Sequence, residues 1–134
     1  MKPTTVVKVS GRKRDLFLAD PEFVYVGRSF GGFIGGIFGN PYRKPTIIGS
    51  AVFMFASELM IAIDHPGFAE MQFDRRAEAL PTLQGKKLGC WCLDWDGTGE
   101  PPIECHAVVL ALAADGRLEE IREFLKGDQG RPYK

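Results

Sequence analysis

Three short segments of apolar, β-branched and aromatic residues predict β-strands. Thr4–Ser10 mixes valine with threonine and lysine, Phe23–Val26 is aromatic and β-branched, and Lys86–Trp91 follows the turn Gln84-Gly85. Such residues favour strands because their side chains pack well on a pleated, half-buried surface. We therefore predict one strand over each of the three segments.

Longer segments with apolar residues at helical spacing predict four helices. These helices are expected over Gly49–Asp64, Phe68–Leu80, Glu104–Ala114 and Leu118–Lys126. A proline or glycine follows each segment, and these residues commonly end a helix.

Strands that alternate with helices predict a single small α/β domain with a mostly parallel or mixed sheet flanked by helices. The domain is expected to span residues 1–126, and residues 127–134 are expected to form a flexible tail. Only three strands are evident, so the order of the strands stays open.

The helix predicted over Gly49–Asp64 has almost no polar face. Nearly every position of Ala51–Ile63 is apolar, but about 13 residues are too few to span a bilayer, which needs ~20. A helix that is apolar on all sides has to be buried on all sides. It is therefore either a central core helix or part of a homodimer contact through Phe53, Phe55 and Met60.

Length and composition exclude several classes of protein. The chain has 134 residues, of which 45% are hydrophobic, so it is neither disordered nor collagen-like. The N-terminus has no apolar signal segment, and three cysteines cannot form a disulfide framework. We expect a cytoplasmic protein in a reducing compartment, without a membrane partner.

The net charge of zero conceals an uneven distribution. Residues 1–57 contain eight basic and three acidic side chains, a net charge of +5, and the remainder contains nine and fourteen, a net charge of −5. No acid lies between Glu22 and Glu58. The distribution either arises by chance or creates an anion-attracting face in the N-terminal half.

Six of the thirteen residues in the segment Gly27–Gly39 are glycine. Glycine lets a ligand approach backbone N–H groups closely, and flanking bases would attract a phosphate or carboxylate. The alternative is a hairpin whose Phe30, Phe33, Ile34, Ile37 and Phe38 pack inward. The residues expected to bind a small anionic ligand or nucleotide are Gly27, Arg28, Gly39, Asn40 and Arg43.

All three cysteines fall within sixteen residues, at Cys90, Cys92 and Cys105, and His106 follows the last of them. Three thiolates and an imidazole suit zinc, although the spacing differs from the usual zinc motifs. Alternatively, Cys105 or Cys92 acts as a nucleophile activated by His106 or by a helix N-terminus. The third possibility is that the cysteines pack as small apolar residues.

Four ordered motifs resemble a known family. They are Val24–Arg28, Gly39–Tyr42, Leu83–Cys92 and Cys105–Ala107, at the start of an apolar helix. They are similar to the V-Y-I-G-R, G-N-P-F, L-x-G-K-x-L-x-C-W-C and C-H motifs of the domain of unknown function 4326 family, which contains small proteins of bacteria and their phages. The resemblance covers roughly residues 24–112.

The resemblance implies that the residues of these motifs form one shared site. Those residues are Gly27, Arg28, Asn40, Pro41, Cys90, Cys92, Cys105 and His106. This chain departs from the family in a longer glycine-rich segment, a longer loop between Cys92 and Cys105, and a more apolar helix after the Gly-Asn-Pro turn.

Three hypotheses about function follow. The first is an enzyme that acts on a nucleotide or modified base, with Cys105 and His106 as the catalytic residues. The second is a zinc-stabilised module that binds nucleic acid or protein and holds the metal with Cys90, Cys92, Cys105 and His106. The third is a homodimeric phage accessory protein without catalysis, which would pair through the helix at 49–64.

Overall fold

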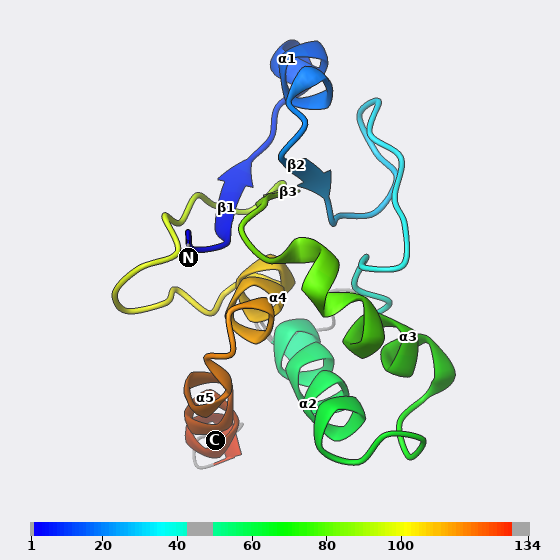
Figure 1. Ribbon diagram of the computed structural model, residues 1–134, viewed down its shortest axis with the longest axis vertical. Helices are drawn as coiled ribbons and strands as arrows, with labels where there is room; N and C mark the ends of the chain where they lie inside the picture. The colour runs from blue at the N-terminus through cyan, green and yellow to red at the C-terminus, as the bar shows by residue number, and fades with distance from the viewer. Residues whose placement is uncertain (1, 43–49, 130–134) are drawn as a thin grey trace.

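A three-stranded parallel sheet lies at the centre of the computed structural model, which describes residues 2–42 and 50–129. The strands are β1 (Thr5–Lys8), β2 (Phe23–Tyr25) and β3 (Lys87–Cys90). Their order is β1-β3-β2, so β3 pairs with both of the other strands (Figure 1). The α/β class and the three predicted strands are confirmed, and the sheet over the described residues is parallel rather than mixed.

Helices connect and cover the strands. They are η1 (Gly11–Lys13), α1 (Arg14–Ala19), α2 (Ser50–Asp64), α3 (Met71–Ala79), η2 (Leu80–Leu83), α4 (His106–Ala114) and α5 (Leu118–Gln129). All four predicted helices are present, although the segment predicted to be helical from Phe68 begins its helix only at Met71. Since α5 continues through Gln129, Gly127 does not end it. Residues 130–134 of the predicted tail lie outside the described residues.

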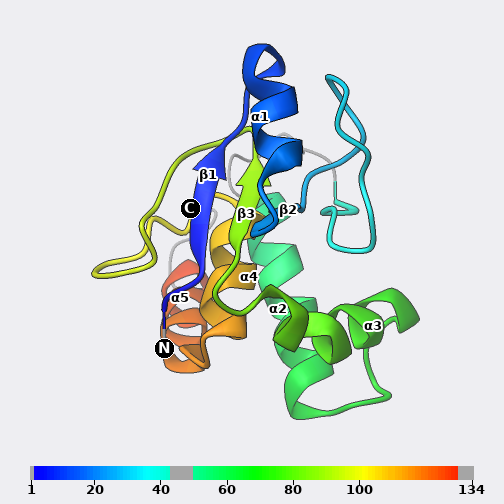
Figure 2. The ribbon, with the colours of Figure 1, turned by 45° about the horizontal axis from the view of Figure 1, so that its top comes forward.

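The sheet presents one face to the helical core. Val6 and Val24 both pair with Leu88, so the three side chains lie in register on the same face. Helix α4 packs against β1 and β3, and every residue from His106 to Ala113 is buried. Figures 1 and 2 place α2, α4 and α5 together at the end of the molecule remote from α1.

Helix α2 is largely buried by the chain's own helices, although Met54 is 42% exposed. It packs against α3, α4 and α5, and Phe55 and Met60 are 0% and 5% exposed. These two side chains belong to the core, so the alternative of a core helix explains them without a dimer contact. No helix within residues 2–42 and 50–129 is both long and apolar enough to cross a membrane.

Aromatic residues cover the opposite face of the sheet. Phe17 of α1 lies 5.2 Å from Phe23 of β2, and Phe33 of the glycine-rich segment stacks on Tyr25 at 4.9 Å. Helix α1 was not expected, because its six residues have neither a capping side chain nor the length that periodicity needs. It serves to carry Phe17 to this aromatic cluster.

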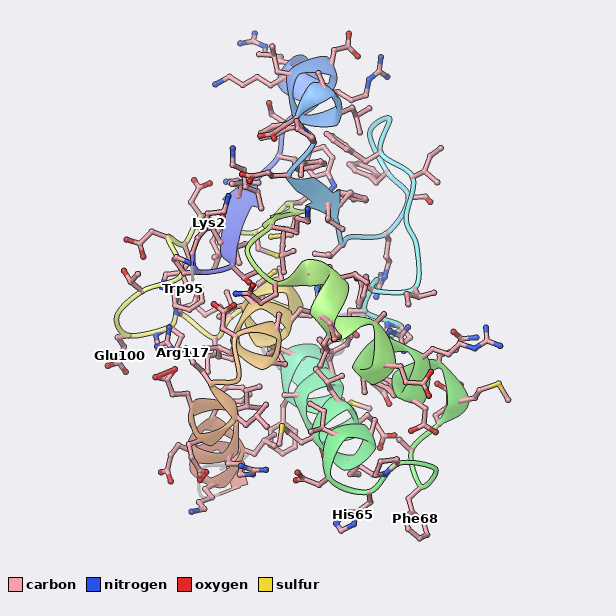
Figure 3. All side chains as sticks on the ribbon, viewed as in Figure 1. Lys2, His65, Phe68, Trp95, Glu100 and Arg117 are labelled. Atoms are coloured by element: carbon pink, nitrogen blue, oxygen red, sulfur yellow. The ribbon has the colours of Figure 1, made fainter. Side chains whose placement is uncertain are left out.

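The loop after β3 covers the outer edge of β1. Trp95 and Val6 exchange two backbone hydrogen bonds of 2.8 Å in an antiparallel bridge. Arg117 lies over the Trp95 ring at 5.4 Å and donates to the carbonyl groups of Gly97 and Gly99. Figure 3 shows Trp95 and Arg117 side by side, with Glu100 at the tip of the loop.

Candidate metal centre

The three cysteines meet at the carboxyl end of the sheet. Cys90 is the last residue of β3, and Cys92 follows it by two positions. Cys105 occupies the N-cap of α4, the helix that packs beneath β1 and β3. A loop of twelve residues, numbered 93 to 104, therefore connects Cys92 to Cys105 and brings Cys105 back beside the first two cysteines.

The thiol sulfurs are close enough to share one ion. All three sulfur atoms lie within 4.8 Å of one another, and the Sγ atoms of Cys90 and Cys105 are 3.4 Å apart. No disulfide joins them. Cys90 and Cys105 are buried, whereas Cys92 is exposed, so the group is reached from solvent on the Cys92 side.

The proximity of the thiols favours one thiolate in the group. Hydrogen bonds from Cys105 and then from Cys92 hold the pKa of Cys90 well below its usual value. The same bond to Cys90, together with burial, raises the pKa of Cys105. A thiolate is the form of cysteine that binds metal, so the arrangement suits a cation.

His106 lies next to this group but does not belong to it. Its Nε2 is 2.7 Å from the carbonyl oxygen of Val26, to which the ring donates a hydrogen bond. Burial lowers the pKa of His106, which keeps the imidazole neutral. Over the described residues the group able to hold a metal is therefore Cys90, Cys92 and Cys105, rather than these three with His106.

The geometry does not favour Cys105 as a nucleophile. Its side chain is 1% exposed, and its proton is donated to Cys90. His106, the expected partner, is directed to Val26 instead. A catalytic pair of Cys105 and His106 stays a prediction from the sequence.

The glycine-rich segment forms a tight hairpin. Phe30 and Phe33 pair across Gly31 and Gly32, which both have positive φ angles of 60° and 91°. Such a turn favours glycine at both central positions. Phe33 and Phe38 are buried, while Phe30, Ile34 and Ile37 are exposed, so only part of the predicted apolar set packs inward.

Arg28 closes the base of this segment. Its Nε donates to the carbonyl of Asn40 at 2.9 Å, and its Nη2 donates to the carbonyl of Tyr42 at 2.6 Å. Gly39 lies against Gly27, where an added Cβ would be 3.4 Å from the Gly27 oxygen. These bonds direct most of the Arg28 guanidinium to the backbone instead of a ligand.

Asn40 joins the same segment to α2. Its side-chain amide donates to the carbonyl of Ala51, and its oxygen accepts from the N–H of Tyr42. Asn40 is 9% exposed, and these two bonds hold the end of the segment against α2. Arg43, the last predicted ligand residue, lies outside the described residues.

Comparison with known proteins supports a common origin for these motifs. Residues 9–116 match the family described as "Domain of unknown function (DUF4326)". The chain belongs to this family. The matched part of the DUF4326 chain includes the three cysteines and the whole glycine-rich segment. No curated protein and no solved structure matches the chain.

Arg76 of the DUF4326 domain is a candidate site residue that the sequence did not single out. It lies on α3 and reaches the glycine-rich segment, where it donates to the carbonyl groups of Ile37 and Gly39. The sequence does contain a signal, because Phe73, Arg76 and Leu80 lie at helical spacing on the buried side of α3 and η2.

Proposed function

We propose that this DUF4326 protein binds one zinc ion through the sulfurs of Cys90, Cys92 and Cys105. The observation that carries the proposal is the mutual approach of three sulfurs within 4.8 Å. Thiolates are preferred ligands of zinc, and residues separated by one position at a strand end share a face.

The fourth position of the ion is left to an external ligand. No fourth histidine, cysteine or carboxylate of the described residues joins the group. Zinc with three protein ligands and an open position is typical of sites that bind water or a substrate, whereas structural zinc has four protein ligands. The open position therefore points to a zinc centre with an exchangeable ligand rather than to a purely structural site.

The identity of the ligand at that position stays a prediction from the sequence. A nucleotide or modified base stays the prediction for an enzyme, and nucleic acid or a protein stays the prediction for a binding module. Cys92 is exposed, so the external ligand would arrive on its side of the ion. The glycine-rich hairpin contacts Trp91, the residue between the first two cysteines, through Phe30 and Phe33.

Metal analysis of the full chain, purified without chelator, tests the proposal. We expect about one zinc per chain, and Cys92→Ser should remove most of it, because the set would fall to two cysteines. Cys92 is exposed, so this substitution leaves no cavity in the core. Replacement of zinc by cobalt should give the visible absorption of thiolate-bound cobalt.

Two control variants make the result specific. Glu100→Gln changes an exposed acid at the tip of the same loop and should retain zinc (Figure 3). His106→Gln should also retain zinc, because His106 is outside the cysteine group. A chain that contains no metal overturns the proposal, and one with the absorption of an iron–sulfur cluster replaces zinc by iron. Loss of zinc in His106→Gln would restore the four-ligand set expected from the sequence.

A further inference from the structure

An apolar groove lies where the end of α2, the helices α3 and η2, the end of α4 and the start of α5 come together. Its volume is about 780 Å³, and Ile63, Leu80 and Leu118 are among the side chains that line it. This volume is within the range of roughly 300–1,000 Å³ that is typical of ligand-binding clefts. The groove is open to solvent rather than enclosed, so a partner can reach it from outside.

One wall of the groove is negatively charged. Asp74 and Glu78 of α3 line it four residues apart, and side chains at this spacing share a face of a helix. None of the described residues that line the groove is basic. Over residues 2–42 and 50–129, neither carboxylate has a basic side chain within ion-pair distance. The groove therefore suits an apolar segment that carries positive charge.

A segment of this kind lies at the other end of the molecule. Leu16 and Leu18 of α1 are 72% and 55% exposed, and Arg12 and Lys13 precede them in η1. We call these four residues the leucine tip. Asp15, the one acid of α1, is already paired with the neighbouring arginine. The two bases of the tip have no carboxylate within ion-pair distance in the part of the chain that the structure describes.

The leucine tip and the groove cannot meet within one chain. Figures 1 and 2 show α1 at the end of the molecule remote from α2, α3 and α5, which contribute to the groove. The distribution of charge favours contact between such ends, since residues 1–57 carry a net charge of +5 and the remainder carries −5. One chain thus contains both halves of a complementary pair, and a second copy can bring them together.

We propose that the leucine tip of one copy docks in the groove of a second copy. The leucines cover the apolar surface of the groove, and the two bases face Asp74 and Glu78. The contact joins two different surfaces, so it repeats along a row of copies or closes into a ring. It differs from the homodimer contact expected from the sequence, because Phe53, Phe55 and Met60 do not line the groove. It uses none of the three cysteines and does not depend on zinc.

Analytical ultracentrifugation of the full chain tests this contact, with a reductant present so that exposed Cys92 forms no disulfide between chains. We expect the average mass to rise with protein concentration and to fall in high salt, which screens the charged part of the contact. Leu18→Ser should weaken association roughly tenfold or more, because an apolar side chain is lost from the contact. Met54→Ser is the matched control, since Met54 is exposed on α2 and belongs to neither surface, and it should change association by less than about twofold.

A mixing experiment distinguishes this contact from one between two identical surfaces. Glu78→Lys reverses a charge of the groove and leaves the tip intact, whereas Leu18→Ser leaves the groove intact. Each variant alone should associate roughly tenfold more weakly than the unmodified chain. The two variants together should form a one-to-one dimer, because the tip of the first fits the groove of the second. Glu100→Lys, at the exposed tip of the loop after β3, is the control for the charge change and should associate like the unmodified chain.

Both test positions are exposed, so neither substitution leaves a cavity in the core, and circular dichroism verifies that each variant is folded. A chain that stays monomeric up to about 1 mM overturns the proposal. Equal association of Leu18→Ser and Met54→Ser also overturns it, as does a mixture of Leu18→Ser and Glu78→Lys that forms no dimer.

Discussion

Two clusters of polar side chains act electrostatically on His106, one with Cys90 and one with Arg28 and Arg76, and they differ in how the chain uses their bonding capacity. At the cysteine cluster, three sulfurs lie close together, and the thiol of Cys105 donates to the sulfur of Cys90. At the arginine cluster, Arg28 and Arg76 together make four hydrogen bonds to backbone carbonyl groups. The sulfurs of the first cluster are close enough to hold an ion, whereas the second cluster mainly holds the glycine-rich segment and, among the described residues, leaves one donor without an acceptor.

The two clusters show how side chains that could bind a ligand can be distinguished from side chains that hold the backbone in place. A charged residue in a motif is a weak indicator of ligand binding until the acceptor of each of its N–H groups is known. Arg28 lies in a recognised motif, yet it binds the backbone, while Arg76 lies in no motif and has a donor without a partner among the described residues. The acceptor that each donor reaches, and not the residue type, therefore shows what an arginine binds.

The largest expected effect is on the cysteine cluster. Removal of zinc with a chelator should lower the melting temperature by roughly 10–15 °C, because a ligand present at ~1,000 times its Kd stabilises the folded state by about 4 kcal/mol. Thermal denaturation with and without chelator measures the change. Cys92→Ser serves as the control and should not respond to chelator. A midpoint that chelator leaves unchanged would mean that the cysteines are packing residues after all.

The next largest effect should come from Arg28. Arg28→Ala removes the two hydrogen bonds to Asn40 and Tyr42 and should lower the free energy of unfolding by about 2 kcal/mol. Urea denaturation measures this loss. Arg12→Ala, at an exposed position of η1, should change it by less than about 0.5 kcal/mol. Equal effects of the two substitutions would show that Arg28 does not hold the segment.

The third prediction concerns His106 and its hydrogen bond to Val26. His106→Phe keeps an aromatic ring against Phe55 but removes the hydrogen bond to Val26, whose carbonyl then lies buried without this donor. We expect a loss of about 1.5 kcal/mol in the free energy of unfolding, again measured in urea. His65→Phe is the matched control, because His65 is exposed beside Phe68 at the far end of the molecule (Figure 3). A neutral His106→Phe would argue against the Val26 bond.

The smallest expected effect is a difference between substitutions at Gly35 and Gly36, two neighbouring glycines of the glycine-rich segment. A Cβ at Gly35 would lie 2.9 Å from the Gly27 oxygen and 2.9 Å from the Ser29 nitrogen, whereas a Cβ at Gly36 would meet nothing within 4 Å. Gly35→Ala should therefore lower the free energy of unfolding by about 1 kcal/mol. Gly36→Ala should be neutral or slightly stabilising. If both are neutral in thermal denaturation, the segment does not pack against Gly27.

Much of the fold could be predicted from the sequence, because its signals are local. The three strands follow from β-branched and aromatic residues, and the helices from periodicity and from the glycines and prolines that end them. Helix α1 was missed, since six residues without a cap give no periodic signal. Helix α5 was predicted too short, because Gly127 was assigned the role of a terminator although the helix passes through it.

The candidate site was predictable only in part. The approach of Cys90, Cys92 and Cys105 follows from their places at a strand end and a helix start. The roles of His106 and Arg28 depend on distant carbonyl groups, at Val26 and Asn40, and no local pattern specifies those partners. The contacts of Arg76 could not be predicted without knowing which face of α3 is buried.

The loop between Cys92 and Cys105 has a second consequence through its bridge at Trp95. By pairing with Val6, this loop occupies the outer edge of β1, which would otherwise offer free backbone donors and acceptors to another chain. Its attachment depends on Arg117, which binds the loop from the start of α5, and on the cysteines at its two ends. Whatever releases the loop therefore exposes an unprotected strand, so its loss would promote association between chains before the core itself unfolds.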